Sequence, residues 1–178
     1  MTEKITINGK VVYKGKIIAI NNNSVKIILN NSEIWILYVQ EISQNYVNPS
    51  IFFRLGDSVF VAIRQRCFDG TLIFTLKGIV NNTVSNFSKH DSIYGIVIAT
   101  CNKGTIIQIT NTITGFISNV YLEKGTAVIA STWKIDNNTN KILLNLDSVL
   151  YDDISNVRLN ISYDNIEIHH ESEIRFVA

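Results

Sequence analysis

The 178-residue sequence is poor in proline, in cysteine and in charge. Proline occurs once, at Pro49, and 17% of residues are charged while 46% are hydrophobic, which excludes a wholly disordered chain. No apolar run approaches the roughly 20 residues that a membrane-spanning helix requires, and the first residues lack the pattern of a secretory signal. Cys67 and Cys101 lie far apart without a CxxC neighbour, so we expect a reducing compartment with neither a disulfide framework nor a zinc site.

The sequence also lacks the usual signatures of catalysis. It contains no Gly-rich phosphate loop, no constellation of a histidine with a nucleophile and no paired-carboxylate pattern. His169 and His170 lie near Glu171 and Glu173, but no third ligand follows at a convincing spacing. We therefore expect no enzyme, no cofactor and no metal, and a solvated tail around these histidines.

The net charge of +1 conceals an asymmetry along the chain. Residues 1–146 carry 14 Lys and Arg against 8 Asp and Glu, whereas residues 147–178 carry 2 against 7. A mildly basic body with an acidic tail is compatible with a polyanionic partner.

Isoleucine and asparagine are abundant. β-Branched residues favour pleated surfaces and asparagine favours turns, so the composition predicts an all-β protein with many tight turns. The same bias is typical of AT-rich genomes, such as that of a plastid or a low-GC bacterium.

The sequence repeats itself at an offset of 80 positions, and repeats indicate architecture before any other signal. Three blocks match without a gap: residues 15–19 with 95–99, 24–29 with 104–109, and 35–38 with 115–118. The first copy then carries about eleven extra residues around positions 48–53, after which residues 56–61 match 125–130. Each copy ends in an apolar run, at residues 72–76 or 142–146.

Each copy thus holds five short apolar runs separated by polar turns, and five such strands suit one small barrel. The matched glycines fit bends of barrel strands or turns with unusual φ: Gly15 with Gly95 and Gly56 with Gly125. The predicted domains are a barrel over 8–78, a linker over 79–91, a barrel over 92–148 and an acidic tail over 149–178. In the tail, residues 157–161 and 166–168 alternate around a turn at 164–165, which favours a hairpin, with a truncated third repeat or an extended tail as alternatives.

The order of these motifs resembles that of the S1 domain, a family of RNA-binding OB-fold barrels. The likeness covers residues 12–148 and rests on the strand-one glycines, on Gly-Phe-Ile-Ser at 115–118, on Gly-Asp-x-Val-x-Val at 56–61 and on the ending at 70–76. It implies two tandem five-stranded OB barrels. It is nearest to the first two domains of bacterial or plastid-type ribosomal protein S1, which anchor that protein on the small subunit.

The chain departs from the family where members that bind RNA well carry aromatic rings. Those positions fall in the first copy at Asn23, Lys26 and Tyr38, and in the second at Lys103, Ile106 and Ser118. Only Tyr38 keeps a ring, and stacking is worth about 1–3 kcal/mol per base. Contacts to the nucleic-acid backbone should therefore dominate, which favours docking on a ribosome.

Basic residues on the predicted strands indicate a phosphate-binding stripe, although lysines that merely solvate outer strand faces look the same. The candidates are Lys14, Lys16, Lys26, Arg54, Arg64 and Arg66 in the first copy, and Lys103, Lys134 and Lys141 in the second. Tyr38 is predicted to stack on a base or to lie at a rim with its hydroxyl in water. Trp133, which aligns with Arg64, is predicted to form an exposed platform or to contact the core or an interface.

The leading hypothesis is therefore an S1-like component of the small ribosomal subunit, in contact with rRNA and neighbouring ribosomal proteins. One alternative is a free protein that binds single-stranded RNA or DNA, and another is a protein-only adaptor of a polymerase or translation factor. No membrane and no small-molecule substrate is expected as a partner. The expected location is intracellular, on the ribosome of a plastid or of an AT-rich bacterium.

Overall fold

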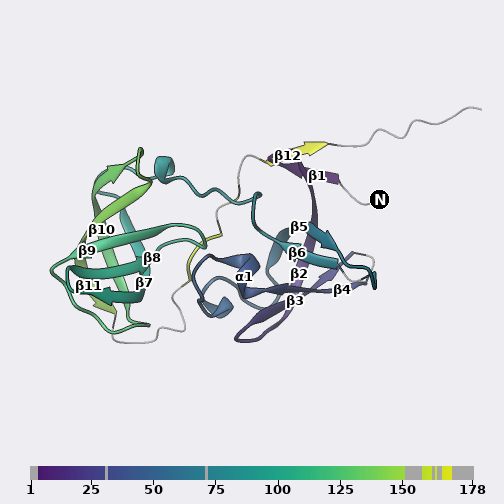
Figure 1. Cartoon of the computed structure of the whole chain (residues 1–178), viewed down its shortest axis with the longest axis horizontal. Coiled ribbons are helices and arrows are strands. Elements are labelled where there is room, and N and C mark those ends of the chain that lie inside the picture. The colour runs from purple at the N-terminus through teal and green to yellow at the C-terminus, as the bar shows by residue number, and fades with distance from the viewer. Residues whose placement is uncertain are drawn as a thin grey trace, which may run out of the picture.

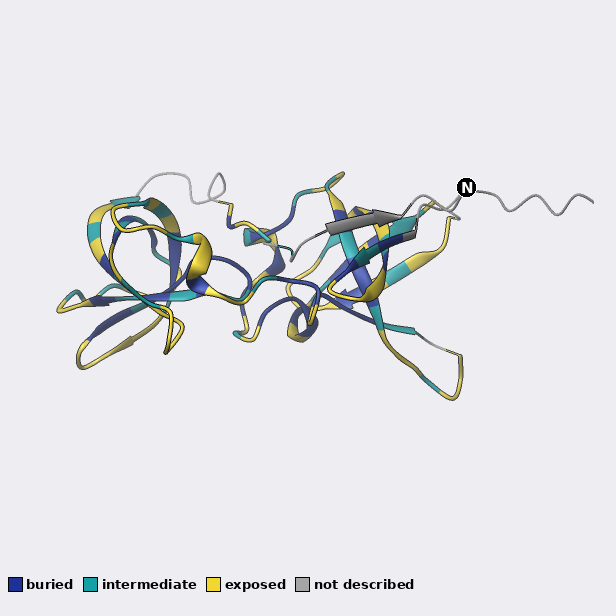
Figure 2. Cartoon of the chain, turned by 90° about the horizontal axis from the view of Figure 1, so that it is seen from above, coloured by how far each residue is buried: buried dark blue, intermediate teal, exposed yellow. Residues whose placement is uncertain are grey.

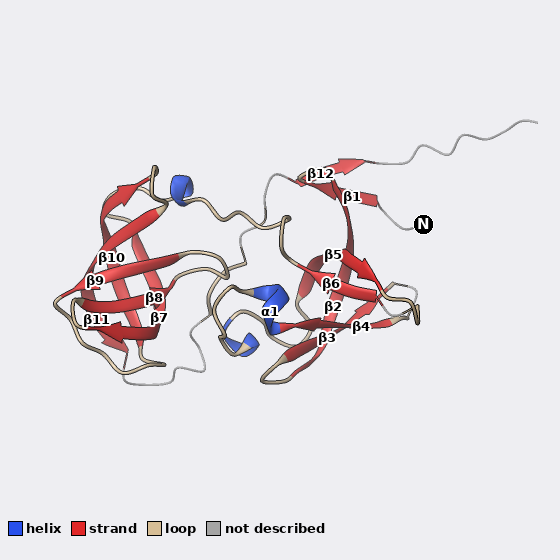
Figure 3. Cartoon of the chain, in the orientation of Figure 1, coloured by secondary structure: helices blue, strands red, loops and turns tan. Residues whose placement is uncertain are grey.

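A computed structural model of the chain describes residues 4–30, 32–70, 72–150, 158–161, 163 and 166–169. These residues are mostly strand, as Figure 3 shows, with single helical turns at α1 (Val39–Ile42), η1 (Pro49–Ile51) and η2 (Val84–Asn86). The strands form two units that lie side by side (Figure 1). The predicted all-β class is confirmed.

The second unit is a closed five-stranded barrel in the order β10-β11-β9-β8-β7. Its strands are β7 (Ser92–Cys101), β8 (Gly104–Gln108), β9 (Thr114–Ser118), β10 (Ala127–Asp136) and β11 (Lys141–Leu150). All neighbours are antiparallel except β9 and β11, whose parallel pairing closes the barrel.

The first unit is a sheet of seven strands. They are β1 (Lys4–Ile7), β2 (Lys10–Ile20), β3 (Ser24–Leu29), β4 (Ile34–Tyr38), β5 (Ser58–Arg66), β6 (Leu72–Thr75) and β12 (Ile166–His169). The path runs β12-β1-β2-β3-β4, while β5 pairs with β2 and with β6. The five strands β2 to β6 thus have the same neighbours as β7 to β11, apart from the closing pair.

Matching hydrogen bonds confirm the sequence repeat. The backbone N–H of Gly56 donates to the carbonyl of Ile17, and that of Gly125 donates to the carbonyl of Val97, each at 2.8 Å. Both glycines have positive φ, +87° and +91°, as a turn there requires. Strands β2 and β7 carry a bulge at the same place, between Ile17 and Ala19 in β2 and between Val97 and Ala99 in β7.

The prediction of a closed five-stranded barrel is wrong for the first copy. Among the described residues no hydrogen-bonded pairing joins β4 to β6, the pair that would close it. These strands meet instead through side chains, because the Trp35 ring stacks on Phe74 with centroids 3.8 Å apart. In addition, β1 and β12 extend the sheet beyond β2.

The described partner of β12 is β1, at the other end of the chain and antiparallel to it, and not residues 157–161, with which the predicted hairpin pairs it. Residues 158–161 and Tyr163 lie against both units: Asn160 bridges to Thr110, and Tyr163 bridges to Val80. The Tyr163 hydroxyl accepts from the backbone N–H of Phe60 at 3.1 Å, and its burial raises the pKa of that hydroxyl. Residues 157, 164 and 165 of the predicted hairpin lie outside the described residues.

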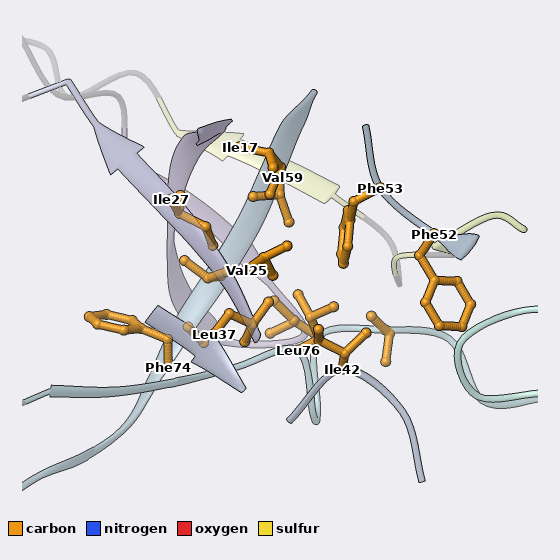
Figure 4. Close-up of a cluster of buried hydrophobic side chains, with 14 of the residues drawn as sticks. Ile17, Val25, Ile27, Leu37, Ile42, Phe52, Phe53, Val59, Phe74 and Leu76 are labelled. Carbon is orange, nitrogen blue, oxygen red and sulfur yellow. The ribbon is translucent and has the colours of Figure 1, made fainter. Parts of the chain in front are cut away.

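Buried and exposed positions alternate along strands of the first sheet (Figure 2), and the buried side chains enclose an apolar core. Figure 4 shows the converging side chains, among them Ile17, Val25, Ile27, Leu37 and Leu76. Each such fully buried side chain stabilises the fold by about 1.5–3 kcal/mol.

The extra residues of the first copy pack between the two units. Phe52 and Phe53 are 1% and 3% exposed and share one apolar cluster with Ile96 and Ala127 of the second unit. The Asn111 side chain donates to the carbonyl of Ile42 at 3.0 Å, at the end of α1, which Figure 1 shows between the units. The insertion therefore joins the two units through a buried interface.

The segment predicted as a linker, residues 79–91, also contributes to both cores. Ile79 and Val80 are buried in the cluster of the first unit, and Val84 is buried in that of the second. None of the helices in the described ranges is long and apolar enough to cross a membrane.

Candidate nucleic-acid interface

The outer face of β2, β3 and β4 brings three predicted site residues together: Lys16, Lys26 and Tyr38. Lys26 lies opposite Ile36 of β4, and Lys16 lies opposite Ile28 of β3. Residues opposite each other in an antiparallel pair share a face, as do residues two apart in one strand, which places Tyr38 beside Ile36. Tyr38 is 44% exposed, so its ring is available to a ligand.

The same face is partly apolar. Ile34 and Ile36 are 59% and 38% exposed, well above a typical core position. Its described residues include no Asp or Glu, and Lys14, two positions from Lys16, adds a third cation. The face therefore combines positive charge, one ring and exposed aliphatic surface.

A second tyrosine lies at the edge of this face, next to the turn between β2 and β3. The start of α1 lies against that turn: the backbone N–H of Val39 donates to the carbonyl of Asn23 at 2.8 Å. The hydroxyl of Tyr46 donates to the side-chain oxygen of Asn23. Because Tyr46 is 69% exposed, its ring faces solvent while its hydroxyl is held at the turn.

The second unit repeats this arrangement at the turn between β7 and β8. The backbone N–H of Asn119 donates to the carbonyl of Lys103 at 2.9 Å, as Val39 does to Asn23 in the first unit. The hydroxyl of Tyr121 donates to the carbonyl of Asn102 at 3.1 Å, and Tyr121 is 60% exposed. Each unit thus presents an exposed tyrosine tied to the turn between its first two barrel strands.

The predicted arginines of the first unit lie elsewhere. The Arg54 guanidinium donates to the carbonyls of Ser50 and Phe53, within the insertion. Arg64 forms an ion pair with the buried Glu41, and Arg66 is exposed at the end of β5.

The predicted residues of the second unit fall at two separate places. Lys103 is exposed in the turn beside Tyr121, whereas Lys134 and Lys141 flank Asp136 at the hairpin between β10 and β11. A hydrogen bond from the Thr139 hydroxyl, 2.7 Å from the carboxylate, is the main cause that lowers the pKa of Asp136; backbone N–H groups and Lys134 add to it. This carboxylate offsets part of the nearby positive charge.

Trp133 is 52% exposed, so its ring is an outer-surface group and not a core one. It lies at the β10 bulge between Thr132 and Lys134, as Arg64 lies at the β5 bulge between Ile63 and Gln65. The alignment of Trp133 with Arg64 therefore corresponds to a shared backbone position.

Sequence reasoning missed Tyr46 and Tyr121. The two residues are 75 positions apart, so the 80-residue offset does not align them, and both follow the third barrel strand in segments of unequal length. A search for an aromatic residue between the third and fourth strands of each copy would have found them.

No metal centre accompanies these residues. Within the described ranges, no three His, Cys, Asp or Glu side chains lie close enough together to hold an ion. The arrangement offers rings for stacking and cations for phosphate contacts.

No protein-family model matches the chain, and no curated protein matches it. Among solved structures it is similar to a multidomain protein with nucleic acid binding domains from Streptococcus pneumoniae TIGR4, with 13% identity and a TM-score of 0.38. That likeness covers 77% of this chain and 51% of the other, so the chain spans about half of that protein. At so low a TM-score, function has to be inferred from the chain itself.

Proposed function

We propose that this chain is a non-catalytic binding module that holds single-stranded nucleic acid in two OB-type units, at the turns that the Tyr46 and Tyr121 hydroxyls contact. The order β10-β11-β9-β8-β7, closed by one parallel pair, supports an OB-type barrel in the second unit. The first unit is an opened version of it with two added edge strands. OB barrels bind oligonucleotides on their second and third strands and on the loop between strands one and two.

The observation that carries this proposal is the pair of exposed tyrosines. Tyr46 and Tyr121 follow the third barrel strand of their units, and their hydroxyls contact the turn between strands one and two. In the second unit the exposed Lys103 lies in that turn. A ring held by its hydroxyl loses little further freedom when a base stacks on it. Stacking on aromatic side chains is tolerant of sequence, because every base has a π-face.

Lysines on the same surfaces support contacts with phosphates. Lys16 in β2, Lys26 in β3 and Lys103 in the turn between β7 and β8 are all exposed. Contacts of this kind strengthen binding to any sequence and weaken as salt rises.

The test is the affinity for a fluorescein-labelled single-stranded oligonucleotide, measured by anisotropy at several salt concentrations. Changing Tyr46 or Tyr121 to Ala should weaken binding by about 1–3 kcal/mol each, or about 5- to 150-fold. Tyr46→Phe and Tyr121→Phe keep the ring and should stay close to the parent protein. Lys26→Ala should reduce the slope of log affinity against log salt by about 0.7 for each lost phosphate contact.

Equal affinity of the Ala and Phe variants would refute stacking as the source of binding. Absence of any binding at low salt would refute the proposal as a whole.

A second candidate function is docking on a larger assembly. The specific version of this hypothesis is an S1-like component of the small ribosomal subunit. It is favoured by the exposed Ile34 and Ile36 on the face of β4, because large exposed aliphatic surface is typical of a protein interface. Co-sedimentation with small subunits after a moderate salt wash, lost in an Ile34→Asp variant but kept in Tyr46→Ala, would select this candidate. Recovery of the parent protein only in the ribosome-free fraction would exclude it, and nuclease-resistant capture of a single protein would indicate an adaptor.

A further inference from the structure

An open groove on the first unit carries three cations, and its lining includes neither Tyr46 nor the turn at Asn23 that Tyr46 contacts. It is lined by the amino-terminal half of β2, the carboxyl-terminal half of β5 and the chain at and after β6, and its lining residues include Lys10, Tyr13, Arg64, Thr75 and Lys77. The side chains of Arg64 and Lys77 are 56% and 54% exposed, so both can reach a ligand from solvent.

The three cations are linked to one another by the fold. The Lys10 amino group donates to the carbonyl of Lys77 at 3.4 Å, which holds the two lysines at one end of the groove. Arg64 and Lys77 both contact the same oxygen of Glu41, and the Lys77 Nζ lies 3.9 Å from it. The backbone N–H of Leu76 donates to the carbonyl of Glu41 at 3.0 Å, which ties α1 to the chain after β6.

Glu41 is unusual in this arrangement. It is 2% exposed, and its Oε2 atom has no hydrogen-bond partner among the described residues. A buried carboxylate is costly unless cations face it, so Arg64 and Lys77 are held over it. One carboxylate against three cations still leaves the groove with a net charge of +2.

The groove therefore presents ordered hydrogen-bond donors whose positive charge exceeds the negative charge of the one carboxylate. A guanidinium has five N–H donors and an ammonium three, and a single carboxylate oxygen satisfies only part of them. Side chains that are already held lose less freedom when a ligand binds. A group with several anionic oxygens, which can accept from all three cations at once, is the chemistry that fits.

We propose that this groove binds a phosphate group, with Arg64, Lys77 and Lys10 as its ligands and Glu41 as a positioning residue. The site is independent of base stacking at Tyr46 and Tyr121. The phosphate can belong to a nucleic-acid strand or be free in solution, and the two sources are separable by experiment.

The test is a nuclear magnetic resonance titration of the full chain, which follows the amide signals of Thr75, Lys77 and Gly78. Inorganic phosphate is added in one arm and a single-stranded oligonucleotide in the other, against sodium chloride at equal ionic strength. Saturable shifts with inorganic phosphate support a site for free phosphate. Shifts with the oligonucleotide alone support a site for a strand. Shifts no larger than those with chloride in both arms overturn the proposal.

Variants assign the ligands in whichever arm shows saturable shifts. Arg64→Ala and Lys77→Ala remove exposed side chains and should each weaken binding about tenfold or more, as loss of a charged hydrogen bond does. Lys89→Ala, which removes an exposed lysine outside the groove, should leave the affinity unchanged. Equal affinities for all three variants overturn the assignment of the groove.

Glu41→Gln distinguishes the role of Glu41 in positioning Arg64 and Lys77 from the effect of its negative charge. The change makes the groove more positive, so binding that depends on charge alone should tighten, whereas loss of positioning should weaken it. Circular dichroism checks that this buried variant is folded, and Lys77→Ala tests the site if it is not. Tyr46→Ala should not alter the phosphate titration. The proposal of a phosphate groove and the proposal of base stacking can therefore be refuted independently.

Discussion

Gly95 in β7 and Gly15 in β2 lie at equivalent positions of the two units, where each faces an isoleucine side chain of the neighbouring strand at close distance. A Cβ atom placed on Gly95 would lie under 3.0 Å from the Cγ2 of Ile107, and one on Gly15 would lie equally close to the Cγ2 of Ile27. Non-bonded carbon atoms normally approach to about 3.5–4.0 Å, so either strand would have to shift by at least about 0.5–1 Å. Because neither glycine has positive φ, the cost of adding a methyl group is steric and not conformational.

Gly95→Ala should therefore lower the free energy of unfolding by about 1–3 kcal/mol, the usual cost of overpacking. Ile107 is fully buried, and Ile107→Ala alone should cost about 2–5 kcal/mol. In that second background the contact with the Cγ2 of Ile107 is gone and the backbone oxygen of Gln108, 3.2 Å from an added Cβ, is the nearest atom left, so Gly95→Ala should be close to neutral. The two changes should thus be coupled by about 1–3 kcal/mol.

The free energies of unfolding of the parent, the two single variants and the double variant are measured by urea unfolding followed by circular dichroism. Gly125→Ala is the matched control: its φ is +91° and nothing lies within 4 Å of an added Cβ, so its cost should be conformational and independent of Ile107. Additive effects of Gly95→Ala and Ile107→Ala would show that the close approach is not what requires glycine there. A coupled pair at Gly95 and an uncoupled one at Gly15 with Ile27 would contradict the equivalence of the two units.

Two further predictions concern the insertion and the β10–β11 hairpin. Phe52→Ala should cost about 3–5 kcal/mol in urea unfolding, because Phe52 is 1% exposed within the cluster shared by both units; a loss below about 1 kcal/mol, typical of a surface position, would place the insertion outside the core. Thr139→Val should raise the pKa of Asp136 toward its usual 3.8, whereas Thr139→Ser should keep it low. Since the folded-state pKa of Asp136 is lowered, its contribution to stability is present above pH 3.8 and is lost as pH falls through the folded-state value. Carbon-13 titration of the carboxyl group measures this pKa. An unchanged titration midpoint in Thr139→Val would refute the role of the hydroxyl.

The repeat and most of the strands were predictable from the sequence. Alternation of apolar and polar residues is a local signal, and β-branched runs between asparagine-rich turns indicate strands without any knowledge of their partners. The glycines at 15 and 95, and those at 56 and 125, could be matched because a close approach and a turn with positive φ each require that residue in both copies. Lys16 and Lys26 were predicted as part of a basic stripe, and it is the strand register that brings them to one face with Tyr38.

The tyrosines at the turns depended on loop geometry, which alternation does not encode. Tyr46 and Tyr121 reach equivalent places through segments of different length, each directed by backbone hydrogen bonds to the turn between the first two strands of its unit. Likewise, the contact of Arg64 and Lys77 with Glu41 joins residues that the sequence places far apart.

Sequence alone therefore determined the strand class, the twofold repeat and the outward residues of each strand, because these depend on neighbours along the chain. The tertiary structure decided which edge strands of each unit pair with each other. The second unit is sealed by β9 and β11, whereas in the first the stacked rings of Trp35 and Phe74 lie between β4 and β6, and β12 pairs with β1 from the opposite end of the chain. Pairing at a strand edge depends on what else reaches that edge in space, and a pattern of period two carries no information about a partner more than a hundred residues away.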